Sequence, residues 1–288
     1  AGPTASGKSK LAIKLAQHFN GEIINADSMQ IYKEISILNS RPKKEDLKII
    51  KHHLYGFNSV KKKFSTGHWL KITEEKINDQ WKKGLTPIVV GGTGLYFKAL
   101  TSGLVKIPDI PNKLRIKIRK LQKKMGQEKF YQQLIQLDPL AESSVLPTDT
   151  QRSIRVYEVK KFTNKSLFEL IKDTKSHFDN SVFKKIFINT PKDLLNKNIE
   201  ARVEQMFKDG AVKEAKFFFN MKVYIELSSH KIIGINEIKK YLLGKMSLIS
   251  TKELITIKTR QYAKRQFTWS RGHMKSWNMI YSSNINDL

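Results

Sequence analysis

The chain has 288 residues, which is long enough for one large domain or for a core with a smaller insert. Forty per cent of the residues are hydrophobic and there are only 15 glycines and 8 prolines, a composition that excludes wholesale disorder. Lysine and arginine number 53 against 26 acidic residues, a net charge of +27. This excess favours a polyanionic partner such as nucleic acid, and a generally lysine-rich proteome is the alternative explanation.

Two absences narrow the classes of protein further. The chain contains no cysteine, which excludes disulfide scaffolds, thiolate zinc sites and cysteine nucleophiles. No apolar run approaches the roughly 20 residues that cross a bilayer, and no charged-then-apolar leader opens the sequence. We therefore expect a soluble, cytoplasmic protein without a membrane partner, and we expect it to be a monomer.

The first part of the chain alternates helix and strand. Leu11, Leu15 and Phe19 recur at helical spacing, and residues 22–26 predict a short buried strand. A second helix capped by Thr66 and a second strand over residues 87–90 repeat the pattern. We assign residues 1–106 to the first part of an α/β core.

Helical periods alone follow, from residue 107 to residue 180, so we predict an inserted all-helical domain there. Residues 181–288 return to the core, with a strand over residues 185–189, Thr190–Pro191 as the N-cap and first turn of a helix, and C-terminal helices. The last long helix is expected from about Thr251 to just before Gly272, with one face that carries Ile255, Thr259, Tyr262, Gln266 and Trp269. The predicted fold class is α/β, with a P-loop NTPase-like parallel sheet flanked by helices.

The opening residues carry the strongest motif. The segment fits G-x-x-x-x-G-K-[ST], in which backbone N–H groups and a helix N-terminus cradle phosphate oxygens. Its residues are Gly2, Pro3, Thr4, Ala5, Ser6, Gly7, Lys8 and Ser9. Lys8 would add a point charge to a diphosphate or triphosphate, and Ser9 a hydroxyl ligand for Mg²⁺. A strand ordinarily feeds such a loop, so we expect that strand to be missing from an N-terminally short chain.

The motif does not say what happens to the phosphate. The Asn-Lys-x-Asp signature of GTPases is absent, and the strand over residues 87–90 ends in Gly91 and not in a carboxylate. Asp27 follows the other strand instead, close in topology to the phosphate loop. Its carboxylate could bind a metal through water, accept a proton, or simply cap a turn.

Several blocks together resemble one family, the tRNA dimethylallyltransferases. Three of them lie in the first part of the chain, at residues 2–12, 25–32 and 87–96. Three more follow in the family's order, at residues 138–141, 149–155 and 260–269. The chain departs from the family at Leu38–Pro42, where a Gly-Thr-Ala-Lys-Pro stretch is usual and where Arg41 keeps the positive charge.

The resemblance implies a reaction. The donor would be dimethylallyl diphosphate, and the exocyclic amine of a tRNA adenosine 3′ of the anticodon would attack its allylic carbon. Asp27 would take the amine proton, and Lys8 and a Ser9-held Mg²⁺ would stabilise the departing diphosphate. Thr93 would contact the donor or the target nucleotide, and an ordinary helix cap is the alternative. Arg202 lies close to the apolar stripe of its helix, and the resemblance makes its anion the diphosphate, although a neighbouring carboxylate would also suit a buried arginine.

The resemblance also implies contacts to the anticodon arm of tRNA. The residues concerned are Asp27, Ser28, Met29, Gln30, Thr93, Arg115, Gln151, Arg152, Ser153, Ile154 and Arg155. A face rich in lysine and arginine from Asn112 to Met125 could track phosphates, although a solvated helix face has the same composition. The target base must leave its stack, so we expect a narrow channel to Asp27.

Two other functions stay open at this point. A phosphate-loop kinase of a nucleoside or small metabolite would share the fold class, and a non-catalytic RNA-binding module would share the charge. The pair His52–His53 suggests a metal, but no spaced carboxylate or further histidine accompanies it, so we expect a structural role.

Overall fold

The structure, a computed structural model, describes residues 1–285, so the last three residues of the predicted second core segment lie outside it. The described chain divides into two compact units. One consists of residues 1–100 together with the residues from 181 onward, and the other of residues 101–180. The second unit begins six residues before the position 107 that the sequence suggested.

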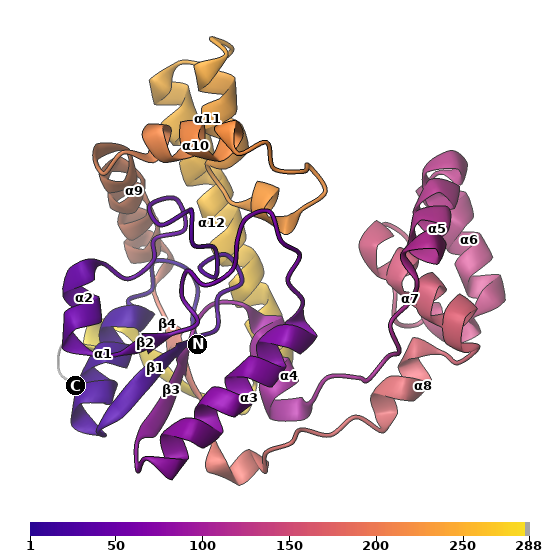
Figure 1. The fold of residues 1–288 in the computed structure, drawn as a ribbon, viewed down its shortest axis with the longest axis horizontal. Coiled ribbons are helices and arrows are strands. Elements are labelled where there is room, and N and C mark those ends of the chain that lie inside the picture. The colour runs from indigo at the N-terminus through magenta and orange to yellow at the C-terminus, as the bar shows by residue number, and fades with distance from the viewer. Residues whose placement is uncertain (286–288) are drawn as a thin grey trace. The chain divides into compact units, whose positions relative to one another are not determined.

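Parallel strands form the centre of the first unit (Figure 1). β1 (Gly21–Asn25) lies between β2 (His52–His53) and β3 (Thr86–Val90), and its register with β3 runs from Gly21 opposite Thr86 to Asn25 opposite Val90. A second parallel pair joins β4 (Ile186–Asn189) to β5 (Asn278–Tyr281). The Ile188 amide donates to the Ala1 carbonyl at 2.9 Å, so the residue that enters the glycine-rich loop lies beside β4.

Eight α-helices begin in the described residues of this unit: α1 (Lys8–His18), α2 (Lys44–Ile49), α3 (Thr66–Lys82), α4 (Gly94–Ser102), α9 (Lys192–Lys208), α10 (Ala211–Asn220), α11 (Ile235–Leu242) and α12 (Leu248–His273). Ala12 and Ala16 of α1 pack against Ile23 and Val90 of the sheet. A larger core joins the segment after β1 to the C-terminal helices. It includes Ile35, Val203, Phe218 and Ile255.

Three helix ends differ from the sequence prediction. The cap of α3 is Ser65, whose hydroxyl accepts from the His68 amide at 3.1 Å, and not Thr66. Pro191 takes the cap position of α9, and the buried Thr190 hydroxyl makes no hydrogen bond within the described residues. α12 starts three residues before Thr251, because Ser247 accepts the Ser250 amide and so begins the helix earlier.

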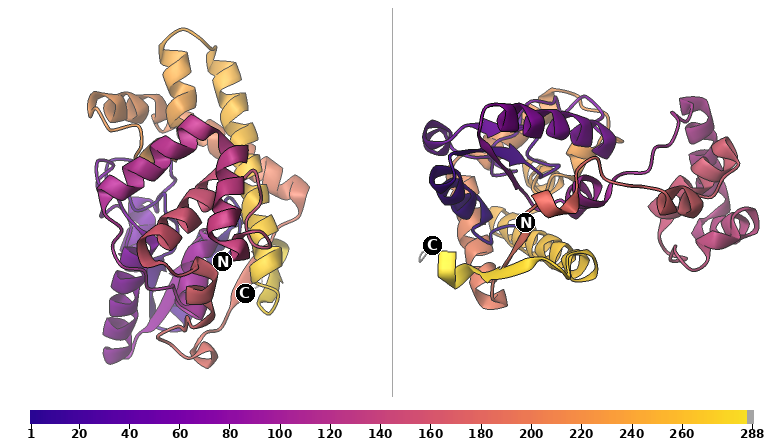
Figure 2. Two further views of the ribbon diagram at one scale, coloured as in Figure 1. Left: turned by 90° about the vertical axis from the view of Figure 1, so that its right-hand side faces the viewer. Right: turned by 90° about the horizontal axis from the view of Figure 1, so that it is seen from below.

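The second unit is helical. Its helices are α5 (Asn112–Met125), α6 (Gln127–Leu137), α7 (Thr150–Thr163) and α8 (Leu167–Lys172), and in Figure 2 these magenta-to-salmon helices pack against one another. Phe130, Leu134, Val156 and Tyr157 form the buried centre. No strand occurs between residues 101 and 180, all of which the structure describes. Among residues 1–285, no helix has the length and apolar character that crossing a membrane requires.

Candidate functional site

The glycine-rich loop turns directly into the first helix. Ala5 and Gly7 both have positive φ angles, 62° and 84°, and Gly7 is the residue immediately before Lys8, the first residue of α1. No acidic residue lies in the first turn of α1. Backbone N–H groups at a helix N-terminus carry partial positive charge, so this loop can receive the oxygens of an anion.

Lys8 and Arg202 place two positive charges at this loop. The Lys8 Nζ donates to the Pro3 carbonyl at 3.1 Å, and the Arg202 Nη1 donates to the Thr4 hydroxyl at 2.9 Å. Burial lowers the pKa of Lys8 to about 8 and also lowers the pKa of Arg202, while the charge of Asp27 opposes both shifts. The three groups therefore interact across one small region.

Arg202 has no carboxylate partner in an ion pair within the part of the chain that the structure describes. Of the two anions considered from the sequence, the ion pair with a neighbouring carboxylate is therefore not observed among the described residues, although the charge of Asp27 acts on Arg202. A buried guanidinium that donates to a hydroxyl of the phosphate loop still has donors for an external anion.

Asp27 follows β1 and is held by a local turn. Its amide donates to the Asn25 Oδ1 at 2.8 Å, and its own Oδ1 accepts from the Met29 amide at 2.9 Å. One carboxylate oxygen thus caps the turn, which is the plain structural role considered from the sequence. The other oxygen makes no hydrogen bond among the described residues, so Asp27 can cap the turn and still offer an acceptor.

Thr93 lies at the end of the neighbouring strand and contacts the same turn. Its hydroxyl accepts from the Ser28 amide at 2.9 Å and lies 3.2 Å from the Ser28 hydroxyl, and its amide donates to the Ala26 carbonyl. Gly91 permits this approach, because a Cβ at that residue would lie 2.1 Å from the Ala26 carbonyl oxygen. The carboxyl ends of β1 and β3 are therefore joined directly.

Ser28, Met29 and Gln30 complete this turn. The amide groups of Ser28 and Met29 are used by Thr93 and Asp27, and the Gln30 side chain donates to the carbonyls of Asn39 and Ser40. The segment that departs from the family pattern is therefore attached to the turn. The Gln30 side chain is the group that holds the segment over residues 38–42 beside this turn.

Arg41, in that departing segment, points inside the unit. Its guanidinium occupies the space above Gly56, and burial lowers its pKa while Glu214 and Glu34 act in the opposite direction. Glu214 also accepts from the amides of Ile37 and Leu38, at 2.9 and 2.8 Å. The charge of Arg41 is balanced internally, which the sequence did not indicate.

Gln266 is a site residue that the sequence prediction missed. Its Oε1 accepts from the Thr4 amide at 2.8 Å and its Nε2 donates to the Gly92 carbonyl at 2.9 Å, so one side chain of α12 joins the phosphate loop to the loop after β3. The signal was present, because the expected face of this helix carries Gln266 between Tyr262 and Trp269. The local pattern does not indicate its partner Thr4, which is 262 residues away in the sequence.

Three tyrosine hydroxyls lie within electrostatic range of the Asp27 carboxylate. The pKa values of the Tyr55, Tyr96 and Tyr262 hydroxyls are raised, first by burial and then by the negative charge of Asp27. Tyr96 also stacks on Trp69, with ring centroids 4.2 Å apart. The charge of Asp27 thus acts on these three phenols and on the two cations Lys8 and Arg202.

The donor set fits Mg²⁺ through oxygen. Ser9, the second residue of α1, is exposed, and the buried Ser6 hydroxyl has no hydrogen-bond partner among the described residues. Hydroxyl groups and substrate phosphate oxygens are hard ligands that Mg²⁺ accepts together with water. Within the described chain, no group of three or more His, Asp or Glu side chains could hold a metal on its own.

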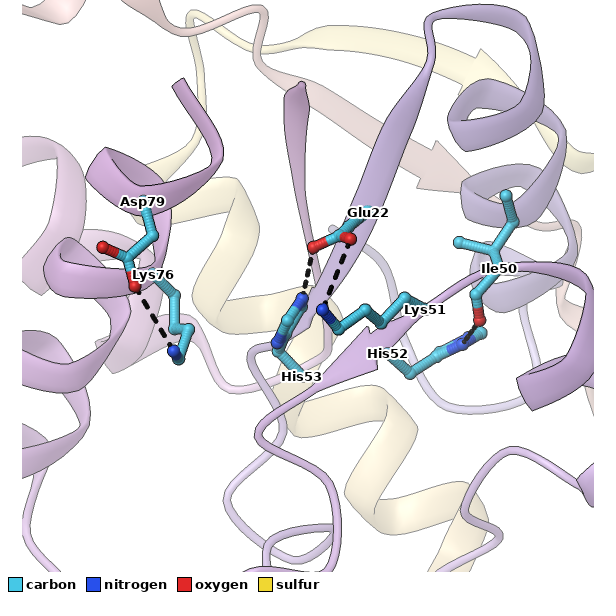
Figure 3. Close-up of polar contacts among 7 residues, drawn as sticks. All are labelled: Glu22, Ile50, Lys51, His52, His53, Lys76 and Asp79. Carbon is cyan, nitrogen blue, oxygen red and sulfur yellow. Dashed lines mark hydrogen bonds and ion pairs between the residues drawn. The ribbon is translucent and has the colours of Figure 1, made fainter. Parts of the chain in front are cut away.

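The two adjacent histidines have structural partners (Figure 3). The His53 Nε2 lies 2.6 Å from a Glu22 carboxylate oxygen, and Lys51 lies on the other oxygen at 3.7 Å. The His52 ring contacts the Ile50 carbonyl at 2.7 Å. Both rings are thus used within the sheet edge, as expected from the sequence.

The remaining predicted tRNA contacts belong to the helical unit. Gln151 and Arg152 are exposed at the start of α7, and Arg115 and Arg155 are half-buried on α5 and α7. Ser153 is fully buried with its hydroxyl on the Asp149 carbonyl at 2.8 Å, and Ile154 packs against the core. The surface that this block offers therefore consists of its glutamine and arginines.

This fold and site define an α/β protein in which a glycine-rich loop, two cations and a strand-end aspartate lie close together. The model of the IPP transferase family matches residues 30–273. The chain belongs to that family.

Individual relatives of this chain carry the name tRNA dimethylallyltransferase. A tRNA dimethylallyltransferase of Pelagibacter ubique strain HTCC1062 is 52% identical over 276 residues, which are 96% of this chain and 88% of the relative. A tRNA dimethylallyltransferase of Rickettsia massiliae strain Mtu5 is 42% identical over 275 residues, 95% of this chain and 76% of the relative.

Solved structures are similar as well. A eukaryotic dimethylallyltransferase acting on tRNA superposes with a TM-score of 0.83 at 29% identity, over 98% of this chain and 72% of that chain. The tRNA isopentenylpyrophosphate transferase of Bacillus halodurans gives a TM-score of 0.70 at 27% identity, over 99% and 91%.

Proposed function

We propose that this protein transfers the dimethylallyl group from dimethylallyl diphosphate to the exocyclic N6 amine of the adenosine 3′ of the anticodon in tRNA, and releases diphosphate. The observation that carries the proposal is the grouping of Asp27, Lys8 and Arg202 beside the glycine-rich loop. The family and its named relatives support the same reaction.

The reaction needs one bond to form as another breaks. The amine nitrogen attacks the allylic carbon, the carbon–oxygen bond to the diphosphate breaks, and the amine proton goes to the oxygen of Asp27 that the Met29 amide leaves open. Asp27 is thus the proposed base.

The departing diphosphate gathers negative charge as its bond breaks. Lys8, Arg202 and the N–H groups of the loop over residues 2–9 stabilise that charge. Mg²⁺, when bound, would supply further positive charge to the diphosphate oxygens, and Ser9 is the residue proposed to hold it.

Thr93 and Gln266 are proposed to set the distance between the base and the leaving group. Thr93 fixes the Ser28 amide next to Asp27, and Gln266 fixes Thr4 of the phosphate loop to Gly92. A misplacement of about 1 Å between reacting groups can cost roughly a hundredfold in rate. These two side chains therefore matter without transferring a proton themselves.

For the fold, we propose a P-loop NTPase-like core in residues 1–106 and 181–288, and a tRNA-binding domain inserted at residues 107–180. The basic excess supports RNA contacts from both parts, because residues 107–180 hold 15 of the 53 basic residues. We propose that the protein acts on the anticodon arm as a cytoplasmic monomer.

The test is incubation of the protein with tRNA and radiolabelled dimethylallyl diphosphate, followed by nucleoside analysis. We expect label in a prenylated adenosine, and none when the tRNA carries another base 3′ of the anticodon. A parallel incubation with labelled ATP tests the kinase alternative, which predicts phosphate transfer to an acceptor. Tight tRNA binding with no modified base would instead leave only an RNA-binding module.

A further inference from the structure

A buried carboxylate lies among the arginines of the helical unit. Glu158 of α7 has a side chain only 4% exposed, and its two oxygens face different helices. The Oε1 lies 3.7 Å from the Arg119 Nε on α5, and the Oε2 lies 3.7 Å from the Arg155 Nη1 on α7. The arginine side chains are 60% and 40% exposed, so each extends from the buried charge to the surface.

Stability of the helical unit does not explain this arrangement. The Glu158 Oε1 accepts no hydrogen bond in the described residues, and the buried Arg115 Nε donates none. A buried charge without hydrogen bonds is costly, and a buried ion pair seldom stabilises a protein more than apolar residues of similar volume would.

The arginines need an opposite charge to stay close together. Burial lowers the pKa of Arg155, the positive charge of Arg115 lowers it further, and the charge of Glu158 raises it. Without Glu158, three guanidinium groups on α5 and α7 would repel one another. With Glu158, Arg119 and Arg155 each lie 3.7 Å from one of its oxygens, and their partly exposed guanidinium groups have further N–H donors for another anion.

We propose that Glu158 is a positioning residue that holds Arg119 and Arg155 as a rigid pair for two phosphates of the RNA backbone. The proposal rests on the proposed function, since it takes the polyanion to be tRNA. It goes beyond the expected tRNA contacts, which do not include Glu158. A pre-oriented side chain loses less conformational entropy on binding than a mobile one does.

The direction of the effect separates this role from a simple charge effect. A negative charge near an RNA-binding face opposes binding, so its removal alone should strengthen binding. Removal of a positioning group should weaken binding, because the arginines lose their fixed orientation. Glu158→Gln therefore gives opposite results under the two explanations.

The experiment measures tRNA affinity of Glu158→Gln as a function of salt, together with single-turnover transfer at saturating tRNA. We expect about a tenfold weaker affinity, a slope of log affinity against log salt that is smaller by roughly one, and an unchanged transfer rate. Glu142→Gln is the matched control, because it removes one exposed negative charge that has no arginine partner among the described residues of the same unit, and it should bind as the parent does or more tightly. Parent or higher affinity in Glu158→Gln would overturn the proposal.

Two further variants keep the test decisive. Glu158→Asp retains the charge on a shorter side chain and should give an intermediate loss of tRNA affinity. This variant replaces Glu158→Gln in the test if Glu158→Gln does not fold. Parent affinity in Glu158→Asp would count against the proposal. In an Arg119→Gln/Arg155→Gln background, Glu158→Gln should cause no further loss, and a full additional loss would show that Glu158 acts elsewhere. tRNA binding is measured separately from transfer. An inactive parent protein would therefore refute the proposed function, and the binding data would still test the role of Glu158.

Discussion

The Lys8 ammonium should destabilise the protein until an anion binds beside it. The fall of its pKa from 10.5 to about 8 corresponds to about 3 kcal/mol, at 1.36 kcal/mol for each pKa unit. A lowered lysine pKa means that the folded state favours the neutral amine. Below pH 8 the amine is charged in both states and the folded protein bears the whole cost, which shrinks as the pH rises from 8 to 10.5.

Replacement by an apolar side chain of similar length removes that cost. Lys8→Met also loses the hydrogen bond to the Pro3 carbonyl, worth about 1 kcal/mol, so we expect a net gain of about 2 kcal/mol in the free energy of unfolding at pH 7. For a unit of this size, that gain raises the melting temperature by roughly 4 to 8 °C. The same variant should lose most of its transfer activity, since the diphosphate loses a positive charge.

The assay is thermal unfolding of the parent and Lys8→Met at pH 7, with and without inorganic diphosphate. Diphosphate should raise the melting temperature of the parent, because it binds the folded state, and should have much less effect on Lys8→Met. A Lys8→Met protein that melts below the parent, or that gains as much from diphosphate, would refute the reasoning.

Two other variants test the loops that join the site. Gly91→Ala should unfold the protein or reduce its stability by several kcal/mol, because the new Cβ would lie 2.1 Å from the Ala26 carbonyl oxygen; a normal circular dichroism spectrum with an unchanged melting temperature would contradict the close approach. Gln266→Ala should lower the single-turnover transfer rate by about a hundredfold with little change in tRNA affinity, since it frees the Thr4 amide and the Gly92 carbonyl from their shared partner, and an unaltered rate would remove Gln266 from the site.

Local patterns predicted the elements around the site because each is set by neighbouring residues. The phosphate loop, the strand before Asp27 and the helix face with Gln266 all follow from short spacings in the chain. β2 has only two residues, and β5 has only four residues with largely exposed side chains, and neither strand was predicted. Their existence depends on pairing with β1 and β4, which a local pattern does not contain.

The contacts that arrange the site depend on the fold. Gln266 bonds to Thr4, which is 262 residues away in the sequence. Glu214 accepts from the amides of Ile37 and Leu38, which are 177 and 176 residues away. Side chains of glutamine and glutamate occur on many helix faces, so the sequence gives no reason to single out these two. Residue type did indicate that Arg202 has a polar partner, because an arginine near an apolar stripe needs one wherever the helix lies, and its role toward diphosphate stays a prediction.

Asp27→Asn tests the central claim most directly, because the amide is nearly isosteric with the carboxylate but cannot accept the amine proton. The measurement is single-turnover transfer of the five-carbon group to tRNA at saturating donor, with tRNA binding measured on the same protein. We expect folding and binding to survive and the rate to fall by about 10² to 10⁴. Transfer at the parent rate would contradict the assignment of Asp27 as the base, and loss of tRNA binding would make Asp27 a recognition residue instead.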